Sequence, residues 1–191
     1  ADPVLAGHKF QFINLAVSVE LPLIIVNVQR GGPSTGLPTK MEQADLYQAL
    51  WSRHGESPLV VLAAKSPSDC FATAIEAAQI AIKYMTPVIV LSDGYIANGS
   101  EPWRVPEQSE LPELKVKFLD SAENFRPYGR DPETLARPWI KLGTPDMQHV
   151  TGGLEKNEHS GHIDLTPENH QKMVNVRADK INNVRNDIPP I

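Results

Sequence analysis

The sequence has little cysteine and no long apolar run. Of its 191 residues, Cys70 is the single cysteine, which excludes an internal disulfide framework and a cysteine-based zinc or iron–sulfur site within this chain. A reducing, cytoplasmic setting is therefore expected. The longest largely apolar run, residues 21–28, is far shorter than the roughly 18 residues that a membrane span needs. We expect no membrane partner.

The sequence also lacks a concentration of basic charge. Its net charge is −5 and its pI is about 5.7, and no basic stretch is longer than a pair of residues. That pattern gives no electrostatic footprint for a nucleic acid. The amino terminus has no initiator Met and no signal-peptide pattern. Residues 1–10, "ADPVLAGHKF", match no expected element, and their origin stays open.

Residues 1–103 alternate between two kinds of pattern. Nearly continuous aliphatic runs predict buried strands, the first of them covered on both faces, and 3.6-residue periodicity predicts helices. The strands are expected over 21–28, over 58–64 and within 87–99, where the third strand ends in a turn, and the helices over 10–20, 42–55 and 69–85. Strands that alternate with helices through short connections predict an α/β fold with a doubly wound, mostly parallel sheet.

Capping residues mark the ends of two of these helices. Asp45 falls in the first turn of the helix expected over 42–55, and Gly55 follows its end. Before the next helix, Ser66 is expected as the N-cap, with Pro67 at the first helical position and Asp69 at the third.

The pattern changes after Trp103. Prolines recur every few residues in 104–165 without long periodicity, which predicts an extended arm rather than a second core. Trp103 and Trp139 are expected to anchor this arm, either on a neighbouring domain or subunit or by packing within the chain. A C-terminal helix is expected over 166–184 with Thr166 as its N-cap, and with one packed stripe made of Met173, Val176, Lys180 and Val184.

The segment "VNVQRGGPSTGLPT" (26–39) joins a strand to a loop rich in glycine and proline. Its spacing fits neither a P-loop nor a dinucleotide fingerprint. Arg30 stands at the carboxyl end of the strand, where ligands bind in open α/β sheets, and its guanidinium suits a carboxylate. Ser34, Thr35 and Thr39 add hydroxyl groups. These residues favour a site for a small carboxylate, with a surface arginine beside an ordinary turn as the alternative.

Four long segments of the sequence, in the same order, resemble a known family. "NVQRGGPSTGLPTKMEQADL", "RHGESPLVVLAAKSPSDCF" and "YMTPVIVLSDGYIANGSEPW", with the tail "GGLEKNEHSGHIDLTPENHQKMVNVRADKI", are similar to the α subunit of the 2-oxoacid:ferredoxin oxidoreductases. The 2-oxoglutarate branch is the nearest. The resemblance covers roughly residues 11–188 and identifies Arg30 as the residue that binds the substrate carboxylate and Thr39 as one that positions the 2-oxo acid.

The resemblance implies a thiamine-diphosphate enzyme. In that family a 2-oxo acid is decarboxylated, CoA accepts the acyl group, and electrons pass to ferredoxin. Residues 1–103 would be part of the pyrimidine-side domain, and 104–191 would be an arm and helix that lead to a further C-terminal domain. The β subunit would hold the diphosphate, Mg²⁺ and a [4Fe–4S] cluster. No cofactor-binding, catalytic or metal-binding residue of this chain is identified.

The family pattern also has parts that this sequence lacks. Upstream of this stretch, α subunits carry a glutamate that engages the cofactor's pyrimidine ring and a proline-containing substrate loop. Met41 stands where relatives often have threonine. We therefore expect the chain to be part of a subunit and inactive alone. The alternative is a non-catalytic assembly or binding module with the same fold and without the activating glutamate.

Four further features have an ordinary structural explanation beside a functional one. His54 caps a helix or lies at the cofactor edge. Asp93 forms a turn or faces a site. Cys70 is a packed thiol or a reactive one. His159 and His162, with His170, Glu155 and Glu158 nearby, look like a metal cluster, but Gly161 favours a solvated, mobile linker.

Overall fold

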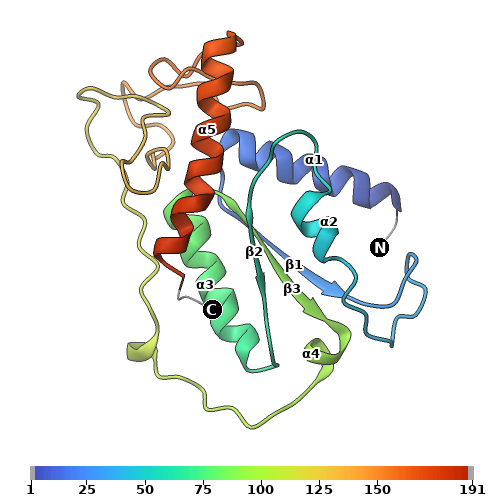
Figure 1. Ribbon diagram of the computed structural model, residues 1–191. Helices are drawn as coiled ribbons and strands as arrows, with labels where there is room; N and C mark the ends of the chain where they lie inside the picture. Colours follow the sequence, from blue (N-terminus) through green and yellow to red (C-terminus); the bar gives the residue numbers. More distant parts are fainter. Residues whose placement is uncertain (1–2, 189–191) are drawn as a thin grey trace.

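The computed structural model describes residues 3–188, with side chains from residue 11 onward. The expectations for residues 1, 2 and 189–191 lie outside the described residues. Figure 1 shows an α/β domain, a long arm and a final helix. In chain order the elements are α1 (Pro3–Val19), β1 (Leu23–Gln29), α2 (Leu46–Trp51), β2 (Val60–Ala63), α3 (Asp69–Tyr84), β3 (Pro87–Asp93), α4 (Gly94–Asn98), the 3-10 turn η1 (Gln108–Glu110), α5 (Pro167–Asn183) and η2 (Val184–Asn186).

The three strands form one parallel sheet in the order β1-β3-β2. The central strand β3 is buried along its whole length, as expected for an aliphatic run between two neighbours. Its pairing with β1 aligns Leu23 with Pro87 and Gln29 with Asp93, so both strands end at the same edge. The expected mostly parallel sheet is confirmed.

Helices cover both faces of the sheet, as the doubly wound class requires. On one face α1 and α2 pack through Ile13 and Ala49 against Ile89 and Leu91. On the other face α3 packs against Val88 and Val90, and η2 adds Val184 to that cluster. Figure 1 shows the same arrangement, with α1 and α2 on one side of the strands and α3 and α5 on the other.

The helix expected over 42–55 is shorter in the structure. α2 spans residues 46–51, so Asp45 stands at its N-cap rather than in its first turn, and His54 lies beyond its end. The side chain of Gln43 donates to Asp93 at 2.6 Å, and the backbone N–H of Asp45 donates to the side-chain oxygen of Gln29 at 2.9 Å. These two contacts hold the chain before α2 out of a helical conformation.

Three other expectations are corrected by the structure. β1 is not covered on both faces, because Val26 is 60% exposed and most of the strand is not buried. α1 begins at Pro3, within the stretch that matched no expected element. α3 has Ser68 rather than Ser66 at its N-cap position, although the Ser66 hydroxyl still accepts a bond from the N–H of Asp69 at 3.3 Å.

The arm between α4 and α5 packs on its own chain through both tryptophans. Trp103 lies 5.1 Å from Phe71 of α3, measured between ring centroids. The indole N–H of Trp139 donates to the carbonyl of Ile82 at 3.2 Å. α5 then follows at Pro167 after Thr166, and Met173, Lys180 and Val184 are buried, so the expected C-terminal helix and its packed stripe are confirmed.

A buried carboxylate joins α1, the arm and α5. Glu20 follows α1 and is 5% exposed, and its side chain contacts Lys180 of α5 and Arg130 of the arm. Arg137 also donates to the Glu20 carbonyl at 3.2 Å. Burial raises the pKa of Glu20, but the attraction of Lys180 and Arg130 outweighs it, so the pKa lies below its ordinary value.

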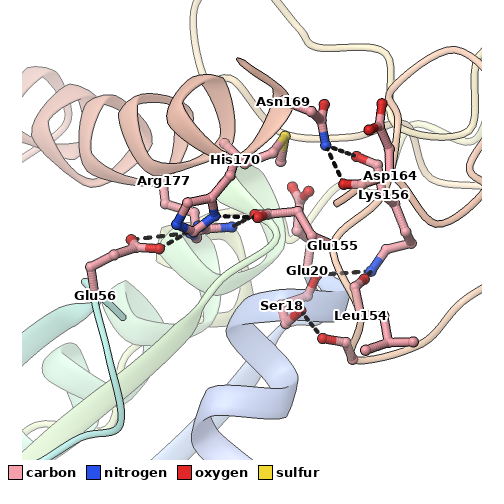
Figure 2. Close-up of polar contacts among 12 residues, drawn as sticks. Ser18, Glu20, Glu56, Leu154, Glu155, Lys156, Asp164, Asn169, His170 and Arg177 are labelled. Atoms are coloured by element: carbon pink, nitrogen blue, oxygen red, sulfur yellow. Dashed lines mark hydrogen bonds and ion pairs between the residues drawn. The ribbon is translucent and has the colours of Figure 1, made fainter. Parts of the chain in front are cut away.

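A second set of polar contacts fixes α5 to the segment that precedes it. In Figure 2, Arg177 of α5 lies between Glu56 and Glu155, and His170 also points to Glu155. The ammonium of Lys156, which is 5% exposed, donates to the carbonyls of Gly152 at 2.5 Å and Leu154 at 2.6 Å. This segment is therefore ordered and held against the α/β domain.

The Glu20 contacts predict a large and pH-dependent effect of one substitution. Glu20→Gln leaves the buried charges of Lys180 and Arg130 uncompensated, so we expect a loss of about 3–5 kcal/mol in the free energy of unfolding, measured by denaturant titration. Because the folded-state pKa of Glu20 is lowered, its stabilisation is present above its unfolded pKa of about 4.3 and is lost as pH falls through the folded value. The free energy of unfolding of Glu20→Gln should therefore lack the part of the pH dependence that the Glu20 carboxylate contributes.

Lys83→Met is the matched control. It removes a partly exposed ion pair with Asp187 and should change stability by about 1 kcal/mol or less. Equal losses in the two variants would contradict the special role of Glu20.

Candidate functional site

A cleft of about 1130 Å³ lies at the carboxyl edge of the sheet. The ends of parallel strands meet there, which is where open α/β folds bind ligands. Three segments line it, from 38–43 after β1, from 65–67 after β2 and from 93–101 around α4. A second hollow of about 820 Å³ lies between α3 and the arm. The first cleft is the candidate site because the loop at residues 30–42 forms one of its walls.

Backbone hydrogen bonds close the loop at residues 30–42 on itself. The N–H of Gly31 donates to the carbonyl of Lys40 at 2.8 Å, and the N–H of Leu37 donates to the carbonyl of Gly31 at 3.0 Å. These bonds bring the two ends of the loop together, so Arg30 and Thr39, nine residues apart in sequence, flank the Gly31–Lys40 bond. Arg30 and Thr39, which the sequence singled out, are therefore chain neighbours of the two residues that this bond joins.

The predicted residues do not all face the cleft. Thr39 lines it, whereas Arg30, Ser34 and Thr35 are exposed and lie outside its lining. Among residues 11–188, whose side chains the structure describes, none makes a hydrogen bond or ion pair with the Arg30 guanidinium. With respect to these residues, Arg30 is an unpaired cation on the same loop as Thr39.

Asp93 is the one acidic side chain at the end of β3, and its carboxylate is fully engaged. Oδ1 accepts from the N–H groups of Tyr95 at 2.7 Å and Ile96 at 2.9 Å, as the N-cap of α4. Oδ2 accepts from the Gln43 amide at 2.6 Å. The bonds from Gln43 and Ile96 outweigh desolvation and lower the pKa of Asp93. Asp93 is a cap, as its turn interpretation expected, and it also lies in the cleft.

Sequence reasoning did not identify Gln43, Lys40 or Lys65 as site residues, and all three line the cleft. Lys40 and Lys65 are exposed and make no ion pair within the described residues. A partial signal existed, because Lys65 follows β2 as Arg30 follows β1, and strand ends of a parallel sheet converge. The pairing of Gln43 with Asp93 spans 50 residues and leaves no signal in the sequence.

The other candidates lie away from the cleft. His54 is exposed beyond α2. The Cys70 thiol contacts the Ser66 carbonyl at 3.5 Å in the first turn of α3. His159 is exposed beside Glu158 at 3.4 Å, and Gly161 lies in a short hairpin rather than a mobile linker, because its N–H donates to the Asn157 carbonyl at 2.8 Å. In the part of the chain that the structure describes, no group of three or more His, Cys, Asp or Glu could hold a metal ion.

Comparisons with known proteins agree on one family. The family model described as pyruvate flavodoxin/ferredoxin oxidoreductase, thiamine diphosphate-binding, matches residues 9–167. The 2-oxoglutarate oxidoreductase subunit KorA of Mycobacterium tuberculosis is 57% identical over 92% of this chain and 27% of its own length. The 2-oxoglutarate synthase subunit KorA of Methanothermobacter marburgensis is 35% identical over 93% of this chain and 47% of its own length.

A solved structure gives the same result. It is that of the 2-oxoglutarate:ferredoxin oxidoreductase from Magnetococcus marinus with 2-oxoglutarate, coenzyme A and succinyl-CoA bound. The TM-score is 0.90 at 34% identity, and the match covers 97% of this chain and 32% of that one. The chain thus spans about a quarter to a half of the length of these relatives. Among residues 3–188, no helix has the length and apolar character that crossing a bilayer requires.

The close packing of the loop predicts that Gly36 tolerates no side chain. A Cβ at Gly36 would lie 2.8 Å from the carbonyl oxygen of Pro33 and 2.9 Å from that of Gly32. Gly36→Ala should therefore distort the loop at a cost of about 1–3 kcal/mol, and the amides of Leu37 and Lys40 should exchange roughly tenfold faster. Peptide-level hydrogen-exchange mass spectrometry of residues 30–42 measures this.

Gly32→Ala is the control on the same loop, because the nearest atom to its Cβ lies 3.9 Å away. It should exchange like the parent chain. Unchanged exchange in Gly36→Ala would show that the loop does not have the packing described here.

Proposed function

Because this chain belongs to the thiamine-diphosphate-binding pyruvate flavodoxin/ferredoxin oxidoreductase family, we propose that it is part of the α subunit of a 2-oxoglutarate:ferredoxin oxidoreductase. The complete enzyme would decarboxylate 2-oxoglutarate, transfer the acyl group to CoA and pass the electrons to ferredoxin. Residues 1–103 would form part of the pyrimidine-side domain, and 104–191 the arm and helix that follow it. The observation that carries the proposal is the closed loop after β1, which carries Arg30 and Thr39 at the sheet's carboxyl edge.

In this proposal the loop binds and orients the 2-oxo acid. Arg30 pairs its guanidinium fork with the carboxylate next to the 2-oxo group. Thr39 donates its hydroxyl hydrogen to the substrate and fixes its orientation, and Ser34 and Thr35 add hydroxyl contacts on the same loop. The free state of Arg30 supports this role, because the described residues give its charge no other partner.

The described residues fit the substrate better than the cofactor. Thiamine diphosphate, when bound, supplies the electron sink that lets a 2-oxo acid lose CO₂. An activating carboxylate would have to be free to reach it, but Asp93 is engaged by three donors and Glu101 by Ser66 and Ser68. These acids are therefore structural. We assign no cofactor contact or step to them.

We place the diphosphate, Mg²⁺ and the [4Fe–4S] cluster on a companion β subunit. Such a cluster needs four thiolates, and this sequence has one cysteine. Within residues 3–188 no His, Cys, Asp or Glu group could hold a metal ion. Both facts support the division of the active site between subunits.

The surface of α1, α2 and β1 also supports a requirement for partners. Large apolar side chains are exposed on all three, namely Phe12, Val26, Val28, Tyr47 and Trp51. Tyr47 and Trp51 are each 76% exposed. Exposed apolar side chains in such number are typical of a protein–protein contact, and we expect the companion subunit or the rest of this subunit to cover them.

The cleft supports 2-oxoglutarate as the substrate because it offers cations beyond Arg30. A second carboxylate needs a second positive charge, and Lys40 and Lys65 line the cleft without ion-pair partners among the described residues. Thr39 lies next to Lys40 in the chain. A dicarboxylate held by Arg30 at one end would meet these ammonium groups at the other.

The role of Arg30 is tested in the complete enzyme with its companion subunit. Arg30→Ala removes a charged hydrogen-bond partner worth about 1.5–3 kcal/mol, so we expect KM for 2-oxoglutarate to rise roughly tenfold or more. The measurement is 2-oxoacid-dependent reduction of a viologen dye. Arg104→Ala, which removes an exposed arginine of the arm, is the control. Unchanged KM and kcat in Arg30→Ala would rule out the carboxylate role, and an inactive parent enzyme would favour the assembly module.

The role of the two lysines is tested by substrate selectivity. Lys40→Met and Lys65→Met should lower kcat/KM for 2-oxoglutarate roughly fivefold, because an exposed ion pair is worth about 1 kcal/mol at most. The same value for pyruvate, which has no second carboxylate, should not fall. An equal loss of kcat/KM for both substrates would show that the lysines do not bind the second carboxylate.

A further inference from the structure

One carboxylate joins the two walls of the cleft. Asp93 is 2% exposed, and its Oδ1 holds α4, the wall that follows β3. Its Oδ2 accepts from the amide of Gln43, which belongs to the opposite wall after β1. Both walls line the same cleft. A single side chain therefore makes hydrogen bonds to both walls.

The loop at residues 30–42 depends on this link for its attachment. Its other hydrogen bonds are internal. They join Gly31 to Lys40 and to Leu37, and the N–H of Gly32 to the Glu42 carboxylate at 3.1 Å. Among residues 11–188, whose side chains the structure describes, the Gln43 amide alone makes a hydrogen bond from residues 30–43 to another strand or helix. Two residues further on, Asp45 is held to β1 by Gln29 and Asn27. The Gln43–Asp93 bond is thus the contact that joins this end of the loop to the end of β3.

The hydrogen bond between Gln43 and Asp93 is a strong one. An amide that donates to an ionised carboxylate makes a charge-assisted bond, which is shorter and roughly twice as strong as a neutral one. The observed 2.6 Å distance agrees with that. Three donors converge on Asp93, and their bonds keep its pKa below the usual value, so the acceptor stays charged at neutral pH.

We propose that Gln43 and Asp93 are positioning residues for the 2-oxo acid, because their hydrogen bond holds the loop that carries Arg30 and Thr39 against α4. This inference rests on the proposed function of that loop. Neither residue contacts the substrate. Gln43 sets the position of the loop, and Asp93 ties it to the end of the central strand.

The test combines two substitutions in the complete enzyme with its companion subunit. Gln43→Glu places two carboxylates opposite each other and releases the loop, so KM for 2-oxoglutarate should rise roughly tenfold with a smaller change in kcat. Residues 30–42 should also exchange amide hydrogens faster. Adding Asp93→Asn to Gln43→Glu restores a donor opposite an acceptor, while the asparagine Oδ1 can still accept from Tyr95 and Ile96. The double variant should recover both KM and slow exchange.

The rescue separates positioning from simple structural damage. Two independent losses would add in the double variant, whereas a shared bond gives recovery. Arg104→Gln, on the exposed arm, is the control that should change neither measurement. Unchanged exchange of residues 30–42 in Gln43→Glu, or a double variant no better than the single one, would overturn the proposal.

Failure of the proposed function would look different. If the parent enzyme showed no 2-oxoacid-dependent reduction of the dye, the oxidoreductase assignment would fail. The hydrogen-exchange measurement would still decide whether the Gln43–Asp93 bond holds the loop.

Discussion

The buried carboxylate of Glu20 is the contact on which the arrangement of this chain depends. It lies where α1 ends and β1 is about to begin, and it meets cations from the arm and from α5. Removing a carboxylate from water is costly unless cations compensate it, so the three segments must come together for any of them to be stable there. Arg130 and Lys180, which lie 110 and 160 positions after Glu20, are thereby held near the start of the edge strand β1.

The two ends of β1 therefore connect to different parts of the molecule. At its amino end, Glu20 and the backbone contacts of Arg137 and Lys156 anchor the domain to the arm. At its carboxyl end, the chain turns into the loop with Arg30 and Thr39. The rigid strand between them, paired with β3 along seven residues, carries the loop on a stable base. The far end of the loop is held by the bonds of Gln43 to Asp93 and of Asp45 to Gln29.

The sequence predicted the periodic and local features of this fold and missed those that depend on distant partners. The parallel sheet, α3, α5 and the converging strand ends follow from aliphatic runs, helical spacing and caps such as Thr166. The short α2 does not, because Gln43 bonds to Asp93 and Asp45 bonds to Gln29, and these contacts override the helical pattern. The exposure of β1 could not be predicted either. An aliphatic strand has the same sequence pattern whether this chain or another chain covers it. In the site, the loop was visible from its glycines and Arg30, whereas Lys65 and Gln43 enter it only through the topology.

The charges around the cleft show a consistent separation of roles. Its carboxylates are engaged by donors of the protein itself, Asp93 by Gln43 and two backbone N–H groups, and Glu101 by Ser66 and Ser68. Its cations, Lys40 and Lys65, and the neighbouring Arg30 have no ion-pair partner among the described residues. These hydrogen bonds fix the carboxylates in the walls of the cleft, whereas the ammonium and guanidinium groups are left to bind an anionic ligand. The proposed function therefore assigns substrate binding to this chain and leaves the acid and metal chemistry to the surface that faces it.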